Sequence, residues 1–188
     1  LAKEPKGLND ELWTKLAEQG WLGILIPEEH GGLGMGVQEL AVVAEELGRG
    51  AVPGPFLSTV LVANLIAQSQ NDAAKEAWLG KLATGEARGA LALFEDSSEI
   101  DLSTIAAKAV SSNGGVLLNG KKQLVADALA ADVIAVAARN DDGRLVFCLV
   151  DASAPGVDIK SNKLADLTAR SANVYFKNVS VNTDDLLL

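Results

Sequence analysis

Apolar residues in the first half of the chain recur at the spacing of amphipathic helices. The first stripe, Leu12, Trp13, Leu16 and Ala17, follows Asn9-Asp10 and stops near Gly20, where glycine commonly ends a helix. Further stripes predict helices at about 37–47, 56–67 and 72–82. The stretch 56–67 is apolar nearly all round, which is typical of a helix buried by neighbours on several sides. The first half therefore predicts a helical domain.

From Ala87 onward the pattern changes to short runs of Val, Leu and Ile separated by Gly, Asn and Asp, which are strand and turn signals. A succession of strands without intervening helices favours an antiparallel barrel or sandwich. The chain is therefore predicted to be α+β, with an all-α domain over 1–86 and an antiparallel β-barrel or sandwich over 87–188. The candidate strands are 90–95, 105–110, 115–119, 121–126, 132–138, 145–150, 156–160 and 173–181.

The dipeptide Asn119-Gly120 separates two of these candidate strands. Both residue types tolerate positive φ, which the commonest two-residue hairpin turns require. The sequence therefore predicts a hairpin turn between Leu117-Leu118 and Lys121-Lys122.

The charge of the chain excludes some classes of binding partner. The formal net charge is -9, acidic residues outnumber basic ones in both halves, and Lys and Arg form no cluster. Binding to nucleic acid or to anionic lipid needs such clusters. The longest strongly apolar stretch, 56–67, is too short to cross a bilayer, and no signal sequence opens the chain. These features predict a cytoplasmic protein without nucleic-acid partners or membrane insertion.

Two stretches contain residues that could carry chemistry. Cys148 is the only cysteine and lies in an apolar strand pattern, which favours a small core residue over a nucleophile. The glycine-rich stretch 28–36 lacks the P-loop lysine, so a tight connection between helices is favoured over a phosphate loop. His30 within it has no second His to share a metal, and no metal site is predicted.

A set of short motifs follows in order along the chain. They read GWLGILIPEEHGGLG at 20–34, EELGR at 45–49, PGPF at 53–56, LNGKK at 118–122, ADVIAVAAR at 131–139, PGV at 155–157 and FKNVSV at 176–181. In this order they resemble the motifs of the acyl-CoA dehydrogenase family, over about residues 8–188.

The resemblance implies a helical domain, then a β-domain that contacts FAD, then a second helical domain that these residues do not include. It also implies dehydrogenation of an acyl-CoA, in which a carboxylate base removes the α-proton and flavin accepts the β-hydride. In the family the base belongs to the C-terminal domain. We therefore assign no catalytic residue within 1–188 and expect this part of the protein alone to be inactive. Family members form oligomers, so a homo- or hetero-oligomer is expected of the full-length protein.

Two family elements are altered here. The family's TEP-GSD element corresponds to residues 94–101, where only Glu95 and Asp101 match. Its W-I-T/S strand corresponds to Leu124-Val125-Ala126, without the indole and the hydroxyl. Together with DLTAR at 166–170, these departures resemble a divergent bacterial branch of the family. Backbone groups of Leu93, Phe94, Val125 and Ala126 are the predicted flavin contacts.

Two functions therefore follow from the resemblance. The first is an FAD-dependent acyl-CoA dehydrogenase acting on an acyl-CoA thioester. The alternative is a non-catalytic subunit that has lost flavin and assembles with an intact dehydrogenase partner, as the altered residues 94–101 and 124–126 would permit.

Overall fold

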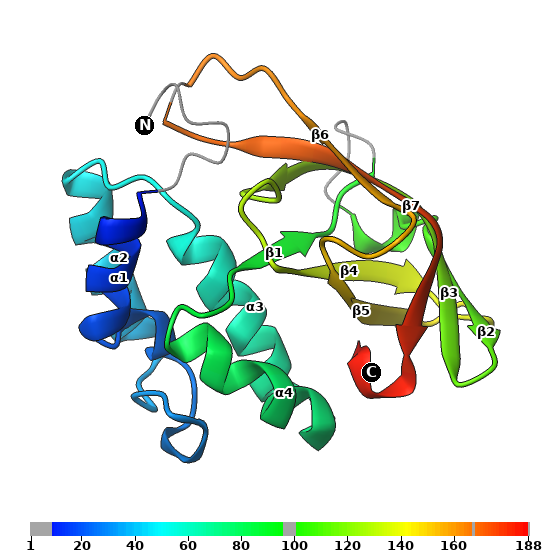
Figure 1. The fold of residues 1–188 in the computed structure, drawn as a ribbon, viewed down its shortest axis with the longest axis horizontal. Helices are drawn as coiled ribbons and strands as arrows, with labels where there is room; N and C mark the ends of the chain where they lie inside the picture. Colours follow the sequence, from blue (N-terminus) through cyan, green and yellow to red (C-terminus); the bar gives the residue numbers. More distant parts are fainter. Residues whose placement is uncertain (1–8, 96–100, 167, 188) are drawn as a thin grey trace.

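The computed structural model describes residues 9–95, 101–166 and 168–187 (Figure 1). The N-terminal part contains four α-helices, and all four predicted helices are confirmed within a few residues. They are α1 (Asp10–Glu18), α2 (Val37–Arg49), α3 (Phe56–Gln68) and α4 (Asp72–Ala83). Short 3-10 turns at Trp21–Gly23 and Glu28–His30 lie between α1 and α2.

Side-chain hydrogen bonds mark where α1, α2 and α4 begin. The Asn9 side chain accepts a hydrogen bond from Leu12 N, and that of Asn71 accepts one from Ala74 N, both at 3.0 Å. Each cap satisfies a backbone N–H that has no partner within the first helical turn. At α2 the Glu39 carboxylate accepts from Gly36 N at 2.9 Å instead. The starts of these three helices are thus encoded locally.

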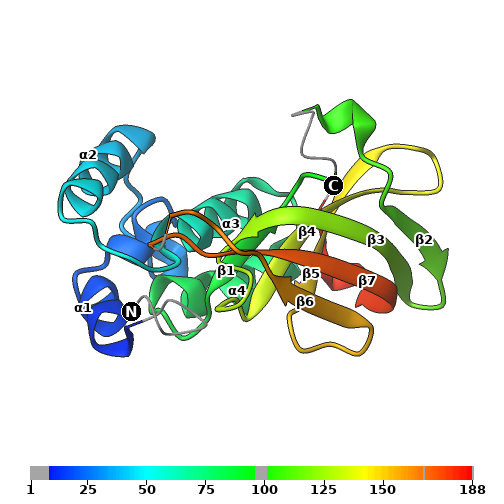
Figure 2. The ribbon, with the colours of Figure 1, turned by 90° about the horizontal axis from the view of Figure 1, so that it is seen from above.

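The β part forms one sheet of eight strands. In chain order they are β1 (Gly89–Ala92), β2 (Lys108–Ser112), β3 (Gly115–Ala126), β4 (Val133–Arg139), β5 (Leu145–Asp151), β6 (Val157–Ser161), β7 (Ser171–Asn182) and β8 (Leu186–Leu187). Their spatial order is β6-β7-β3-β2-β4-β5-β8, and β1 pairs with β4. Figure 2 shows the long strands β3 and β7 running side by side.

The sheet is mixed, so the prediction of a purely antiparallel domain was wrong. Strand β1 runs parallel to β4, with Gly89 opposite Val133, and β2 meets β4 in parallel at Lys108 and Arg139. A parallel pair needs a long crossover connection, which is usually a helix. Here the β2–β3 hairpin lies between β1 and β4 in the chain and serves as the crossover, so the lack of a helix did not exclude parallel pairing.

The predicted hairpin turn at Asn119-Gly120 was also wrong, because both residues lie inside β3. The register of β3 against β7 shifts between Leu118 and Gly120, which marks a β-bulge. A Cβ on Gly120 would lie 2.6 Å from Ala107 Cβ, so this glycine permits a close approach of two chain segments. The β2–β3 turn instead uses the second Asn-Gly pair, Asn113-Gly114, with Gly114 at φ 81°.

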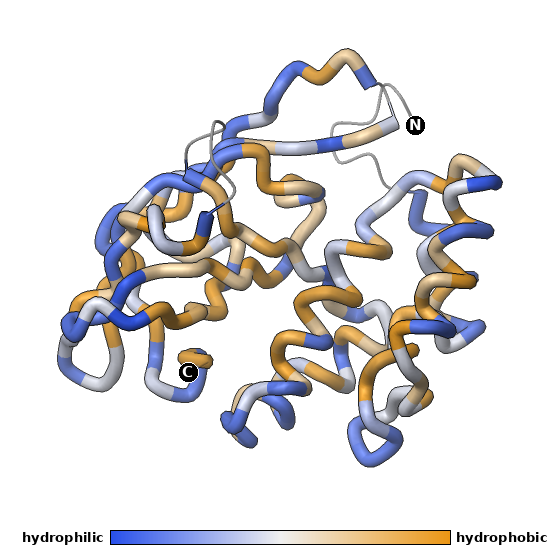
Figure 3. Tube along the Cα trace, turned by 180° about the vertical axis from the view of Figure 1, so that it is seen from behind, coloured by the Kyte–Doolittle hydropathy of each residue, from blue (hydrophilic) through white to orange (hydrophobic). Residues whose placement is uncertain are grey.

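The two faces of the sheet pack against different partners. One face of β3, β4, β5 and β7 encloses a core of its own, which includes Leu118, Ile134, Cys148 and Val174. On the other face, residues such as Val133 pack against α3 and α4. The helical and β parts therefore share apolar contacts. Figure 3 shows hydrophobic residues along the helices and strands and hydrophilic ones mainly at the loops.

Cys148 lies fully buried in the sheet core. Burial raises the pKa of its thiol to about 12, although the nearby Lys122 charge opposes the rise. The thiol therefore stays protonated at neutral pH, and its prediction as a small core residue is confirmed.

The described residues contain neither a membrane-spanning helix nor a metal-binding cluster. No helix among them is both long and apolar enough to span a bilayer. They also contain no group of three or more His, Cys, Asp or Glu that could hold a metal ion.

Candidate functional site

The predicted flavin-contact residues come from two segments, which the fold brings together. Leu93 and Phe94 directly follow β1, and Val125 and Ala126 end β3. Gln123 N of β3 donates a hydrogen bond to Phe94 O at 2.7 Å, so the two segments run beside each other. The two segments lie about thirty residues apart in sequence. The β2–β3 hairpin turns the chain back, so that the end of β3 lies beside the residues after β1.

The surface of these segments offers apolar area and a backbone donor. Leu124 is 50% exposed, with φ 51°, and Ala126 is also exposed. Within the described residues the Phe94 N–H donates no hydrogen bond. An apolar surface beside a free N–H fits a flavin, whose flat ring stacks on apolar groups and whose edge atoms accept hydrogen bonds. The side chains at Phe94 and Ala126 add no hydroxyl.

A buried ion pair fixes the first segment against β3. The Lys122 side chain is fully buried and lies 2.7 Å from Glu95 Oε1 and 3.0 Å from Leu93 O. Glu95 also accepts from Ala106 N at 2.8 Å and Ala107 N at 2.9 Å. The Gln123 amide donates to Glu95 O as well. These contacts therefore hold Leu93 and Glu95, the two sequence neighbours of Phe94, in place.

Opposing effects set the protonation of this pair. Burial lowers the pKa of Lys122, and the hydrogen bond and charge of Glu95 only partly oppose that shift. Burial alone would raise the pKa of Glu95, but the hydrogen bonds from Lys122, Ala107 and Ala106 outweigh it, and the pKa is lowered. Glu95 is thus ionised at neutral pH and compensates the buried ammonium.

Sequence reasoning missed Lys122 because it was interpreted as a strand residue beside a turn. Lys122 lies on the same, buried side of β3 as Leu118, because the register shift between Leu118 and Gly120 places the extra residue in β7 and leaves the alternation of β3 unbroken. Two features of the sequence could have indicated the pair. One is a lysine within a β pattern, and the other is Glu95, which matches the family element although its neighbours do not.

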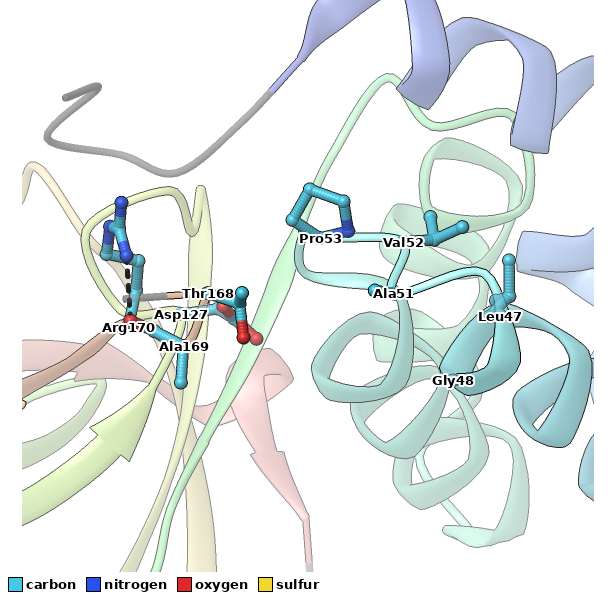
Figure 4. Close-up of a pocket in the computed structure, with 10 residues that line it drawn as sticks. Leu47, Gly48, Ala51, Val52, Pro53, Asp127, Thr168, Ala169 and Arg170 are labelled. Atoms are coloured by element: carbon cyan, nitrogen blue, oxygen red, sulfur yellow. Dashed lines mark hydrogen bonds between the residues drawn. The ribbon is translucent and has the colours of Figure 1, made fainter. Parts of the chain in front are cut away.

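A pocket of about 360 Å³ lies next to these segments, between the α2–α3 connection and the end of β3. Figure 4 shows its two walls facing each other. The helical wall includes Leu47, Gly48, Ala51, Val52 and Pro53, and the β wall includes Asp127, Thr168, Ala169 and Arg170. Asp127 is the residue directly after Ala126. The pocket therefore adjoins the predicted flavin-contact residues.

Asp127 links the two walls. Its Oδ2 accepts a hydrogen bond from Ser58 Oγ of α3 at 2.6 Å, and its backbone N–H donates to Arg170 O at 3.0 Å. Burial raises the pKa of Asp127, while the Ser58 hydrogen bond and the Arg170 charge oppose the rise. Because the folded state favours the neutral carboxyl, Asp127 contributes most to stability below its unfolded pKa of 3.8. That contribution is lost as pH rises through the folded pKa.

Asp127→Asn is therefore expected to raise the free energy of unfolding at neutral pH by about 1 kcal/mol. Asparagine keeps an oxygen for Ser58, tolerates the φ of 56° and carries no buried charge. Urea unfolding over a range of pH measures the effect, which should vanish in acid. A variant less stable than wild type at neutral pH would contradict the prediction, because the carboxylate would then be stabilised in its ionised form.

Comparisons with known proteins agree with this architecture. Residues 2–86 match the model of the acyl-CoA dehydrogenase N-terminal domain, and residues 90–179 match that of the middle domain. Isovaleryl-CoA dehydrogenase of Pongo abelii is 34% identical over 94% of this chain and 44% of its own length. The chain thus spans about half the length of the curated relatives it matches.

Solved structures show the same fold. The Tcur3481-Tcur3483 steroid ACAD is 30% identical, with a TM-score of 0.86 over 96% of this chain and 49% of its own. An acyl-CoA dehydrogenase complexed with FAD from Bacillus anthracis is 28% identical, with a TM-score of 0.82 over 94% of this chain and 31% of its own. The fold is that of the acyl-CoA dehydrogenases, a class of flavoprotein oxidoreductases. The chain belongs to the acyl-CoA dehydrogenase family.

Proposed function

We propose that the full-length protein is an FAD-dependent acyl-CoA dehydrogenase that forms a double bond between the α and β carbons of an acyl-CoA thioester. The observation that carries the proposal is the Phe94 N–H, which has no acceptor within residues 9–95, 101–166 and 168–187 and lies in the segment that runs beside the exposed end of β3. The FAD complex of the Bacillus anthracis relative and the isovaleryl-CoA substrate named for the Pongo abelii relative support it.

The residues of this chain would bind and orient rather than react. Bound FAD would supply the acceptor for the β-hydride, while the α-proton goes to a base. Phe94 N–H would donate to a flavin edge atom, and Leu124 and Ala126 would contact the ring. The Lys122–Glu95 pair would hold Phe94 in place. The base is expected in the family's C-terminal domain, so no residue within 1–188 is assigned that role.

Visible absorption of the purified full-length protein, before and after addition of FAD, tests this function. The expected result is a flavin band of about one FAD per subunit that bleaches when an acyl-CoA substrate is added. Failure to bleach with any acyl-CoA, although FAD is bound, would reject the dehydrogenase function.

Ala126→Asp tests the predicted contact at β3. A carboxylate facing the ring without a partner should weaken FAD binding about tenfold. Ala41→Asp, at an exposed position of α2, is the matched control and should bind FAD as the wild type does. Equal FAD affinities for the two variants would remove Ala126 from the flavin site.

One observation favours a second function. The residues at the family's hydroxyl-bearing positions are Phe94 and Ala126, so hydroxyl donors to flavin are missing. A non-catalytic subunit without flavin, assembled with an intact dehydrogenase, would tolerate this loss. One structural relative carries the joint name Tcur3481-Tcur3483. A full-length protein with no flavin band even in excess FAD would support this alternative and reject the first.

A further inference from the structure

The two walls of the pocket beside β3 differ in chemistry. The helical wall presents apolar or small groups, namely Leu47, Ala51 and Val52. The opposite wall contains the polar or charged residues Asp127, Thr168 and Arg170. A ligand that fills about 360 Å³ here must place an apolar flank against one wall and a hydrogen-bonding atom against the other.

The Asp127 carboxyl can accept more hydrogen bonds than it has within the described residues. Within the described ranges, Ser58 Oγ is the single hydrogen-bond donor to its carboxyl, whereas a carboxyl group can take part in several hydrogen bonds. The Thr168 hydroxyl already donates to Asp166 at 2.7 Å. The Arg170 guanidinium donates to Ala169 O at 2.8 Å. The Asp127 carboxyl therefore keeps hydrogen-bonding capacity for a ligand atom in the pocket.

We propose that this pocket receives the part of the acyl group beyond the reacting carbons, and that Asp127 selects acyl-CoAs whose acyl group carries a hydroxyl there. The proposal rests on the proposed function, because it needs an acyl-CoA lying against the flavin. Asp127 directly follows Ala126, so about 3.4 Å of chain separates the predicted flavin contact from this carboxyl. An acyl group that passes the flavin edge would reach the polar wall within a few carbon atoms.

Other acyl groups match the pocket less well. A plain alkyl chain would displace water from the Asp127 carboxyl without replacing its hydrogen bond, which is unfavourable. A hydroxyl suits Asp127 in either protonation state, because it can donate to the carboxylate or accept from the neutral acid.

Steady-state kinetics of the full-length, FAD-loaded protein test the proposal. Straight-chain acyl-CoAs of graded length are compared with the same chains bearing one hydroxyl at successive positions beyond the β carbon. The best hydroxylated member should exceed its unsubstituted partner about tenfold in kcat/KM, as expected for one hydrogen bond to a charged group. Asp127→Ala should abolish this preference. Asp151→Ala, which removes the carboxylate that caps the Ser153 turn elsewhere in the β part, should leave it intact.

Calorimetric binding of the same acyl-CoA pairs gives a second readout that does not depend on turnover. The wild type should bind the hydroxylated acyl-CoA more tightly than the unsubstituted one. Asp127→Ala should bind both with equal affinity. A wild type that shows no preference, or a preference that survives Asp127→Ala, overturns the proposal while leaving the dehydrogenase function in place. If no acyl-CoA binds or bleaches the flavin, the proposed function fails, and the inference fails with it.

Discussion

Glu95→Gln is expected to lower the free energy of unfolding by about 3 kcal/mol, because it leaves the fully buried Lys122 ammonium without its counter-charge. Removal of one partner of a buried pair typically costs about 3–5 kcal/mol. The lower end applies because the Glu95 side chain is 19% exposed, so water can reach that side of the pair. Urea unfolding followed by circular dichroism measures the loss.

The pH dependence of the loss identifies its cause. Burial already lowers the pKa of Lys122, and loss of the carboxylate should lower it further. A lysine whose folded pKa lies below its unfolded value binds fewer protons when folded, so its contribution to stability rises as pH increases through that window. Glu95→Gln should therefore approach wild-type stability at alkaline pH. A loss that stays constant with pH would instead indicate a packing defect.

Two further variants provide the controls. The double variant Glu95→Gln with Lys122→Met replaces the charge with a side chain of similar volume and should recover most of the lost stability. Asp158→Asn breaks an exposed ion pair, in which the Lys160 side chain is 63% exposed and that of Asp158 is 59% exposed. The stability of this variant should differ little from that of the wild type. A double variant no more stable than Glu95→Gln alone would contradict the charge-based explanation.

The helices could be predicted because their signals are local. Apolar stripes at helical spacing and the Asn9 and Asn71 caps lie within the segments that they define. The nearly all-apolar pattern of α3 also predicted burial, although Leu57 and Leu61 stay 50% and 39% exposed. These two residues lie four apart, on one face of the helix. A single sequence does not tell which face of an apolar helix stays uncovered.

The sheet was harder to predict because pairing joins distant segments. Two Asn-Gly dipeptides carry the same turn signal, and tertiary packing decided between them. At Gly120 the backbone must pass close to Ala107, whereas Gly114 has open space around it. The choice of the wrong turn also hid Lys122, because a turn at Asn119-Gly120 would interrupt the alternation that places Leu118 and Lys122 on the same, buried side of β3.

The candidate site also contains parts that could be predicted from the sequence and parts that could not. The resemblance supplied the flavin-contact prediction at Leu93, Phe94, Val125 and Ala126, which the fold places side by side but which stays a prediction. The Ser58–Asp127 contact joins residues 69 positions apart, and no local pattern indicates it. The Thr168 hydroxyl and N–H both bond to Asp166, which is a local turn motif of a recognisable kind.

The second large effect is expected at the glycine-rich stretch, where Gly32→Ala should lower the free energy of unfolding by about 3 kcal/mol. A Cβ on Gly32 would lie 2.0 Å from Ile26 O and 2.5 Å from Ile26 C, and both are backbone atoms that no rotamer change can move. Ile26 is itself fully buried. The stretch would have to lift off the segment beneath it, losing backbone hydrogen bonds such as Gly34 N to Ile26 O.

Tryptophan fluorescence suits this measurement, because Trp13, Trp21 and Trp78 all lie in the helical part. Gly80→Ala is the matched control. Gly80 lies within α4 with nothing near its added Cβ, so alanine there should raise stability by about 1 kcal/mol through helix propensity. Opposite signs for the two Gly→Ala changes would show that residues 28–36 are required as a tight connection between α1 and α2. A Gly32→Ala protein as stable as wild type would mean that the connection can relax, and would reopen a ligand-binding role for its glycines.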